Sequence, residues 1–123
     1  MKYIFLIYET PADFESRHPD RCADYLAAWR TYHQALLDAG AYIGGAPLKN
    51  VATATTVRVS AGKRHVQDGP FAEAKEQLGG FVILELPSLD TALAWAARCP
   101  AAATGAVEVR PMETEFHDAV CTR

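Results

Sequence analysis

The sequence has no excess of charge of either sign. Its 123 residues include 12 Lys and Arg against 15 Asp and Glu, which gives a net charge of −3 at neutral pH. Direct nucleic-acid binders usually carry a basic patch, so this balance argues against that class. The apolar run at residues 3–8 is far too short to cross a bilayer, and no signal-peptide pattern surrounds it. We therefore expect a cytoplasmic protein that binds neither nucleic acid nor a membrane.

Cysteine is scarce and lacks the spacing of a metal or redox motif. The three cysteines lie far apart, at Cys22, Cys99 and Cys121. The four histidines form no close pair and lie at His18, His33, His65 and His117. A zinc ribbon or a redox centre needs a Cys-x-x-Cys pair, which is absent. We expect free thiols, no metal and no cofactor.

Internal repeats, low-complexity segments and linkers are also missing. Half of the residues are hydrophobic, which is enough for the core of one domain. Residues 113–123 have little pattern, and we expect this tail to be loosely held or to pack on a partner. The domain organisation expected is one domain over residues 1–112 followed by a tail over residues 113–123.

The spacing of apolar residues predicts the elements of that domain. Strands are expected at residues 2–8, 41–48, 81–87 and 105–112, with a hairpin over residues 54–68. Residues 9–19 read as a polar loop. Helical spacing predicts a helix over Asp20–Ala39 with Asp20 as its N-cap. A second helix is expected over Leu89–Arg98, capped by Ser88, with Leu89, Leu93 and either Ala96 or Ala97 facing inward.

The order of these elements, without the hairpin, is βαββαβ. This is the ferredoxin-like plan of an α+β fold, an antiparallel sheet with two helices on one face and here with an inserted β-hairpin. Residues 2–8 and 81–87 are apolar on both faces, yet the second face of the sheet has no cover. A monomer rarely exposes so large an apolar patch. We therefore expect a homodimer in which two sheets pack face to face about a two-fold axis.

The segment "DGPFAEAKEQLGGF", residues 68–81, resembles the signature of the YCII-related domain proteins, in the branch named for its Asp-Gly-Pro-Phe motif. "LLDAGAYIGGAPL", "ATATTVRV" and "LDTALAWAARCPAAATGAVEVRPM" extend the resemblance to about residues 2–112. It implies a ferredoxin-like fold that forms a dimeric α/β barrel.

The resemblance also implies a range of functions. Simple members carry a histidine on the first helix that is thought to pair with an aspartate in a cleft, and some relatives remove halide from aromatic compounds. Counting back from Gly44 and Gly45, that position falls at Trp29 here, and His33 lies one helical turn later. The branch is also often encoded beside alternative sigma factors, which implies a regulatory or stress context.

Two residues are candidates for proton transfer. Asp68 either caps a helix that starts near Pro70 or acts as a general acid or base at the mouth of a cleft. His33 is either a hydrogen-bonded core histidine or a proton-transfer group, since histidine titrates near neutral pH.

Other residues are candidates for substrate binding. Lys75 and Glu76 lie either on a solvated face or in a site where the lysine binds an anionic group and Glu73 or Glu76 tunes it. Phe71 is expected to anchor the loop by hydrophobic burial. Gly45, in the pair Gly44-Gly45, either makes a tight turn or lets the backbone approach a ligand closely.

Two functions are compatible with these residues. The first is a small-molecule cleft near the dimer interface with cofactor-free acid-base chemistry, either elimination or hydrolysis. Asp68 and His33 would be catalytic there, and the substrate would contact Lys75, Glu76, Phe71, Trp29 and Gly45. The alternative is a non-catalytic module that binds a ligand or a partner in the sigma-factor-linked context.

Overall fold

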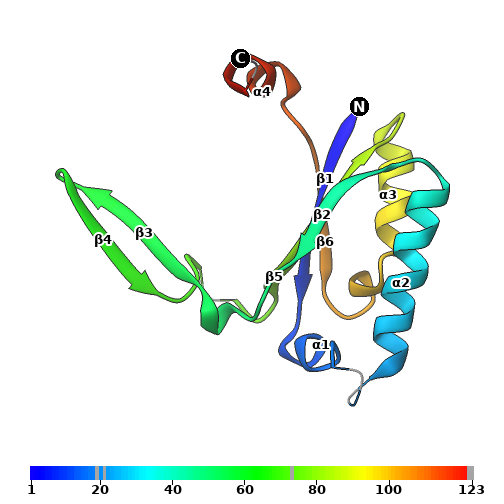
Figure 1. Ribbon diagram of the computed structural model, residues 1–123, viewed down its shortest axis with the longest axis horizontal. Helices are drawn as coiled ribbons and strands as arrows, with labels where there is room; N and C mark the ends of the chain where they lie inside the picture. The colour runs from blue at the N-terminus through cyan, green and yellow to red at the C-terminus, as the bar shows by residue number, and fades with distance from the viewer. Residues whose placement is uncertain (19, 21, 73, 122–123) are drawn as a thin grey trace.

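A computed structural model of the chain describes residues 1–18, 20, 22–72 and 74–121, and its centre is a four-stranded antiparallel sheet (Figure 1). The strands follow the order β2-β5-β1-β6 and are β1 (Lys2–Glu9), β2 (Tyr42–Pro47), β5 (Gln77–Glu85) and β6 (Ala106–Pro111). Helices α2 (Ala23–Asp38) and α3 (Leu89–Arg98) lie together on one side of the sheet. This arrangement confirms the predicted α+β fold with a βαββαβ order and an inserted hairpin.

The core lies between the sheet and these two helices. Burial alternates along β1, so that Tyr3, Phe5 and Ile7 face the helices. Phe5 and Leu84 on the sheet and Leu36 on α2 are almost completely buried. Burying a side chain of this size stabilises the fold by about 1.5–3 kcal/mol. The intervening residues of β1 point to the helix-free side of the sheet.

The helix boundaries differ from the expected ones near the start of the chain. Helix α2 begins at Ala23, and its N-cap is Cys22, whose side chain makes no capping hydrogen bond. The prediction of Asp20 as the cap is therefore wrong. The polar loop expected over residues 9–19 contains a short helix, α1 (Pro11–Glu15). Reciprocal hydrogen bonds between Thr10 and Asp13 form a capping box at its start.

Helix α3 has the predicted bounds, and of the residues predicted for its inner face only Ala96 is buried. The Ser88 hydroxyl caps it by accepting a hydrogen bond from the Thr91 amide at 3.2 Å. Ala92 and Ala96 are buried, whereas Leu89 and Leu93 are about half exposed. The predicted inward position of the two leucines is wrong, because the small alanine side chains let the helix lie close to the sheet.

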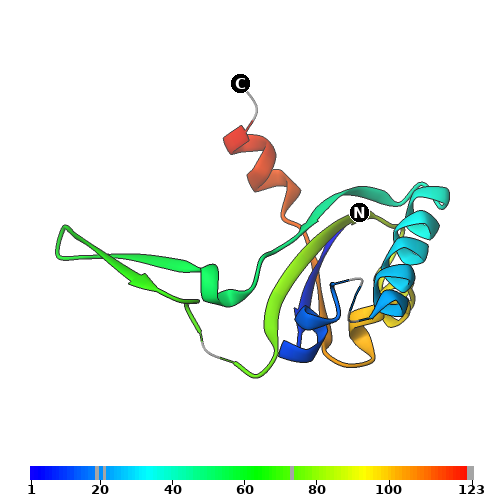
Figure 2. The same cartoon turned by 60° about the horizontal axis from the view of Figure 1, so that its bottom comes forward.

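The inserted hairpin projects away from the main sheet (Figures 1 and 2). Its strands are β3 (Thr55–Ser60) and β4 (Lys63–Asp68), and they form a separate two-stranded sheet, as the sequence predicts. Ala61 and Gly62 both have positive φ angles, 51° and 75°, which suits the twist of a tight hairpin turn. Two short 3-10 turns, Val51–Thr53 and Pro100–Ala102, complete the connections.

The segment after the hairpin is not helical. Within the described residues 69–72 and 74–76 there is no helix, so the expected helix near Pro70 and its capping by Asp68 are wrong. Gly69 instead turns the chain with a φ of 102°, and its amide donates to the Ala54 carbonyl at 2.8 Å. Phe71 is 74 % exposed, so it does not anchor the loop by burial. Its ring lies under the Arg58 guanidinium at 4.7 Å.

The tail forms an exposed helix rather than an unpatterned segment. Helix α4 (Thr114–Cys121) projects, like the hairpin, from the side of the sheet that α2 and α3 do not cover (Figures 1 and 2). All helices among the described residues are too short or too polar to serve as a membrane span. The division of the chain at residue 112 stays a prediction.

Candidate functional site

A cavity of about 550 Å³ lies between α2 and the strands β2 and β5. Its walls are mostly apolar and aromatic, including Leu26, Trp29, Tyr42 and Val82. Cavities of this size and character are the usual binding sites of small molecules in proteins. The two glycine pairs of the sequence, Gly44-Gly45 and Gly79-Gly80, place backbone at its edge, and three of these four glycines line it.

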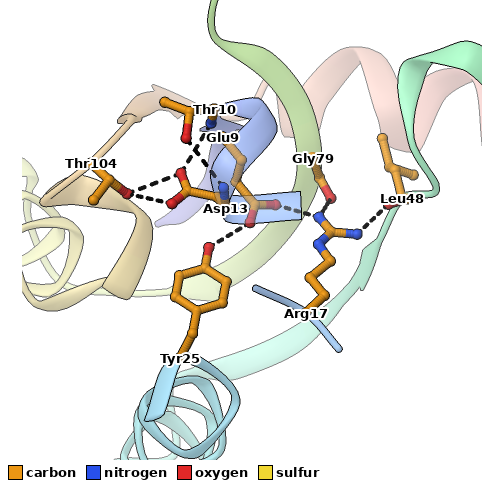
Figure 3. A network of polar contacts seen from close by, with 8 residues as sticks. All are labelled: Glu9, Thr10, Asp13, Arg17, Tyr25, Leu48, Gly79 and Thr104. Atoms are coloured by element: carbon orange, nitrogen blue, oxygen red, sulfur yellow. Dashed lines mark hydrogen bonds and ion pairs between the residues drawn. The ribbon is translucent and has the colours of Figure 1, made fainter. Parts of the chain in front are cut away.

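One end of the cavity is polar and is built around Glu9, the last residue of β1. Glu9 is only 2 % exposed, yet it is an ionisable side chain. Its Oε1 accepts a hydrogen bond from Arg17 Nη2 and forms an ion pair with it, and its Oε2 accepts one from the Tyr25 hydroxyl at 2.5 Å (Figure 3). A buried charge is tolerated only when it is paired and hydrogen-bonded, and both conditions hold here.

Arg17 joins three segments that are distant in sequence. Besides its contact with Glu9, it donates to the Gly79 carbonyl at 2.8 Å and to the Leu48 carbonyl at 2.5 Å (Figure 3). These acceptors lie at the start of β5 and just after β2. The guanidinium therefore ties the segment that follows α1 to both strands that border the cavity.

Helix α1 holds Arg17 in position. The carboxylate of Asp13, in the middle of α1, is buried and receives a hydrogen bond from the Thr104 hydroxyl at 2.8 and 2.9 Å (Figure 3). Together with the capping box to Thr10, this contact fixes α1 against the turn before β6. The chain then leaves α1 at Ser16, so the next side chain reaches Glu9.

Glu9, Arg17 and Tyr25 are here termed the polar centre, and Tyr25 is its hydroxyl donor. Burial, and then the hydrogen bond to Glu9, raise the pKa of Tyr25 well above its ordinary value. The phenol therefore stays protonated at physiological pH and offers its proton to the carboxylate. Glu9, Tyr25 and Arg17 thus form a connected set of one anion, one neutral donor and one cation.

Among the residues of α2 that line the cavity, three follow one another at a spacing of four. Tyr25, Trp29 and His33 share one face of the helix, and from Tyr25 to His33 the axis rises by about 12 Å. Trp29 packs edge-on against Tyr25, with ring centroids 6.3 Å apart. His33 is exposed and packs edge-on against Tyr42 at 4.7 Å, so the core-histidine alternative is wrong. His33 borders the opposite end of the cavity from Glu9.

The structure separates the residues that the sequence predicts for the site. His33, Trp29 and Gly45 line the cavity. Asp68 lies exposed on β4 of the projecting hairpin and is not among the lining residues, so it is not brought together with His33 (Figure 1). Lys75 and Glu76 border a second, shallow hollow with β1 and β6 residues. Glu73 lies outside the described residues, and whether Asp68, Lys75, Glu76 or Phe71 acts in a site stays a prediction.

The polar centre itself is missing from the sequence prediction. Glu9 ends an apolar strand in a buried register, and that position is a signal that could have identified it. The pair Gly79-Gly80 carries a further signal, because a Cβ on Gly79 would press on the Glu9 carboxylate and the Arg17 guanidinium and force them to shift. Arg17 has little local signal, because its hydrogen-bond partners lie 8, 31 and 62 residues away and only the Phe14 ring beneath its guanidinium is near in sequence.

Other kinds of site find little support in the described part of the chain. Among those residues, no group of three or more His, Cys, Asp and Glu is placed to hold a metal ion. The three cysteines are free thiols, as expected, with Cys99 buried and Cys121 exposed.

Comparison with known proteins places the chain in a family. The model of the YCII-related domain matches residues 1–115. An uncharacterised protein of Rhizobium meliloti (strain 1021) is 44% identical over 91 residues, which are 72% of this chain and 70% of that protein. The solved structure of 5-chloro-2-hydroxyhydroquinone dehydrochlorinase (TftG) from Burkholderia phenoliruptrix AC1100, in complex with 2,5-dihydroxybenzoquinone, shares the fold at a TM-score of 0.53. It is 20% identical, over 92% of this chain and 94% of that one.

The family match spans nearly the whole chain, from β1 through the first residues of α4. It includes the segments on which the sequence resemblance rests, and both strands that carry glycine pairs at the cavity. The chain belongs to the YCII-related domain family.

Proposed function

We propose that the chain binds a small, planar, largely apolar molecule in the cavity between α2 and the sheet, and performs acid-base chemistry on it. The observation that carries this proposal is the position of Glu9, a buried carboxylate at the end of a cavity with aromatic walls. Apolar walls favour a ring, and a single polar end orients it. Trp29 and Tyr42 supply the aromatic contacts.

The reaction class proposed is elimination. A ligand hydroxyl at the polar end donates its proton to the Tyr25 oxygen as the phenol passes its own proton to Glu9. The step acts on the keto tautomer of the ligand, in which the ring carbon that bears the leaving group has taken up a proton from solvent and is tetrahedral. The electron pair of the O–H bond forms a carbonyl, the neighbouring C=C bond shifts toward that carbon, and a leaving group such as halide departs as an anion. Arg17 keeps the carboxylate in place throughout. The shared fold of the dehydrochlorinase supports testing this class first, and its 20% identity supports no more than that.

His33 is proposed as a second proton-transfer group at the exposed end of the cavity. Histidine exchanges protons near neutral pH, and this ring is open to solvent. Asp68 can act on a cavity ligand only where a second copy of the chain brings its hairpin to the cavity, because its own hairpin points away.

We also propose that the chain is a homodimer with the helix-free faces of two sheets in contact. In the pairing of β1 with β5, Ile4 lies opposite Ile83 and Leu6 opposite Phe81, and all four are only partly buried. These residues form an apolar surface on the side away from α2 and α3. A second copy of the chain would bury this surface against an identical one.

The test is a panel of phenols, hydroquinones and their chlorinated forms. Binding is measured by quenching of Trp29 fluorescence in a Trp95→Phe background, and turnover by release of chloride. We expect Tyr25→Phe to retain binding and to lose turnover by about 100-fold or more, the usual contribution of a positioned proton donor. Tyr42→Phe, which removes a hydroxyl at the other end of the cavity, is the control and should retain turnover.

Three outcomes separate the alternatives. If no compound of the panel quenches the fluorescence of Trp29, the proposed ligand class is contradicted. Binding without turnover across the whole panel would favour the non-catalytic ligand-binding module. Equal activity of Tyr25→Phe and the unmodified chain would remove the polar centre from the mechanism.

A further inference from the structure

The hairpin formed by β3 and β4, here termed the arm, has an uncovered apolar face. Val57 lies directly opposite Val66 across the two strands, and Val59 follows on the same face. Each of these valines is more than half exposed. An antiparallel hairpin normally turns such a face toward a core, and this one turns it to solvent.

The arm has few means of support within its own chain. A two-stranded hairpin alone in water is marginally stable. Six residues in each strand make an arm of about 20 Å. Hydrogen bonds at its base hold it, from Gly69 N–H to the Ala54 carbonyl and from the Thr56 hydroxyl to the Gly69 carbonyl, each at 2.8 Å. The arm is therefore held at its base by hydrogen bonds and leaves its apolar face free to pack on a partner.

Helix α4 offers a surface that matches the arm in apolar character and is opposite to it in charge. Phe116 and Val120 lie four residues apart, so they share one side of the helix, and both are more than half exposed. The segment 113–121 contains three acidic residues, Glu113, Glu115 and Asp118, and no Lys or Arg. The arm has the opposite balance, with three basic residues against a single acidic one: Arg58, Lys63 and Arg64 against Asp68.

The arm and α4 of one chain do not meet. In both views the two elements project in different directions from the helix-free side of the sheet (Figures 1 and 2). We propose that the arm of one copy packs its valine face on Phe116 and Val120 of α4 in a second copy, with the basic tip of the arm beside the acidic residues of that helix. Two-fold symmetry makes the contact twice per dimer. It rests on the proposed homodimer and is independent of the proposed ligand.

Disulfide trapping tests the contact directly. Cys121 is exposed at the end of α4 and serves as a natural probe. In Val66→Cys, mild oxidation should link position 66 of one chain to Cys121 of another. The product is a covalent dimer on a non-reducing gel, and mass spectrometry of the linked peptides identifies the bond.

Two control variants define the result. His65→Cys places a thiol on the opposite face of the same strand and should cross-link to Cys121 at least 10-fold more slowly. Val66→Cys combined with Cys121→Ser should lose that bond. The proposal is overturned if the bond forms within one chain, if position 66 pairs only with its own symmetry mate, or if His65→Cys links to Cys121 equally fast.

Charge reversal provides a second test that separates the arm from the sheet face. Lys63→Glu with Arg64→Glu should weaken the dimer by about 10-fold in sedimentation at low salt, and so should Glu113→Lys with Glu115→Lys. The four changes together should restore most of the affinity. Leu6→Glu, on the sheet face, should abolish the dimer altogether. A dimer that is broken by Leu6→Glu yet insensitive to every charge reversal would leave the sheet contact standing and overturn the arm contact.

Discussion

The two sides of the sheet differ in how fully their side chains are buried and hydrogen-bonded. On the helix side, Glu9, Asp13 and Tyr32 are buried with hydrogen-bond partners, and no buried side-chain nitrogen or oxygen lacks a partner among the described residues. On the other side, the arm and α4 carry valine and phenylalanine side chains in solvent. On the first side the buried polar groups are paired within one chain, whereas the second exposes apolar side chains that the proposed homodimer would cover. Predictions about the first therefore concern stability, and those about the second concern association.

The largest effect on stability is expected from removing the cation of the polar centre. Arg17→Met leaves the Glu9 charge buried without its ion pair, and we expect a loss of about 3 kcal/mol in the free energy of unfolding. Urea denaturation measures it. Arg110→Met removes an exposed ion pair to Glu108 on the other side and should cost less than about 0.5 kcal/mol. A comparable loss for Arg110→Met would mean that a second copy buries that pair.

A smaller effect is expected from the glycine under the polar centre. The Cβ of Gly79→Ala would press on the Glu9 carboxylate, which its partners hold in place, and overpacking of this kind costs about 1–3 kcal/mol. Gly44→Ala is a matched control in the neighbouring strand, because nothing lies within 4 Å of its added methyl group. Thermal melting compares the two variants. Equal melting temperatures would show that the Glu9 carboxylate moves freely, contrary to the fixed position that the proposed mechanism requires.

The pH dependence of stability should report the buried side as well. Burial raises the pKa of Cys99 from 9.0 to about 11, so the folded state keeps this thiol protonated while the unfolded chain ionises. Stability from this group is complete below pH 9 and declines as the pH rises from 9 to about 11. At pH 10 the loss is about 1 kcal/mol.

Cys99→Ala isolates this contribution. Its unfolding free energy, followed in urea from pH 8 to pH 10, should fall by about 1 kcal/mol less than that of the unmodified chain. The exposed thiol Cys121 provides the control, since Cys121→Ala should leave the pH profile unchanged. Parallel profiles for Cys99→Ala and the unmodified chain would contradict the assignment.

The smallest effect is expected at Asp68. This residue caps no helix in the described structure, so Asp68→Ala should change stability by less than about 0.5 kcal/mol. Asp68→Asn should likewise leave turnover of a cavity ligand unchanged if the polar centre acts alone. Loss of turnover in Asp68→Asn, with binding intact, would show that the arm of a second copy completes the site.

Local patterns determined much of the fold. The alternation along residues 54–68 predicted the hairpin, and Ser88 before an apolar run predicted the start of α3. The order of elements then indicated βαββαβ, because connections between neighbouring strands and helices are short. Each of these inferences uses contacts within a few residues of the chain, which the sequence displays directly.

Only the tertiary structure decided the candidate site. The packing of β1, α2, β2 and β5 brings together Glu9, Arg17, Tyr25, Leu48 and Gly79. The spacing of apolar residues along the chain does not predict which polar side chains will pair across such sequence distances. The same holds for α3, an apolar helix in which close packing selected the alanines for the inner face. Sequence determined which elements form, since that depends on neighbours along the chain. Burial and charge pairing depend on neighbours in space, so they followed only from how the elements pack.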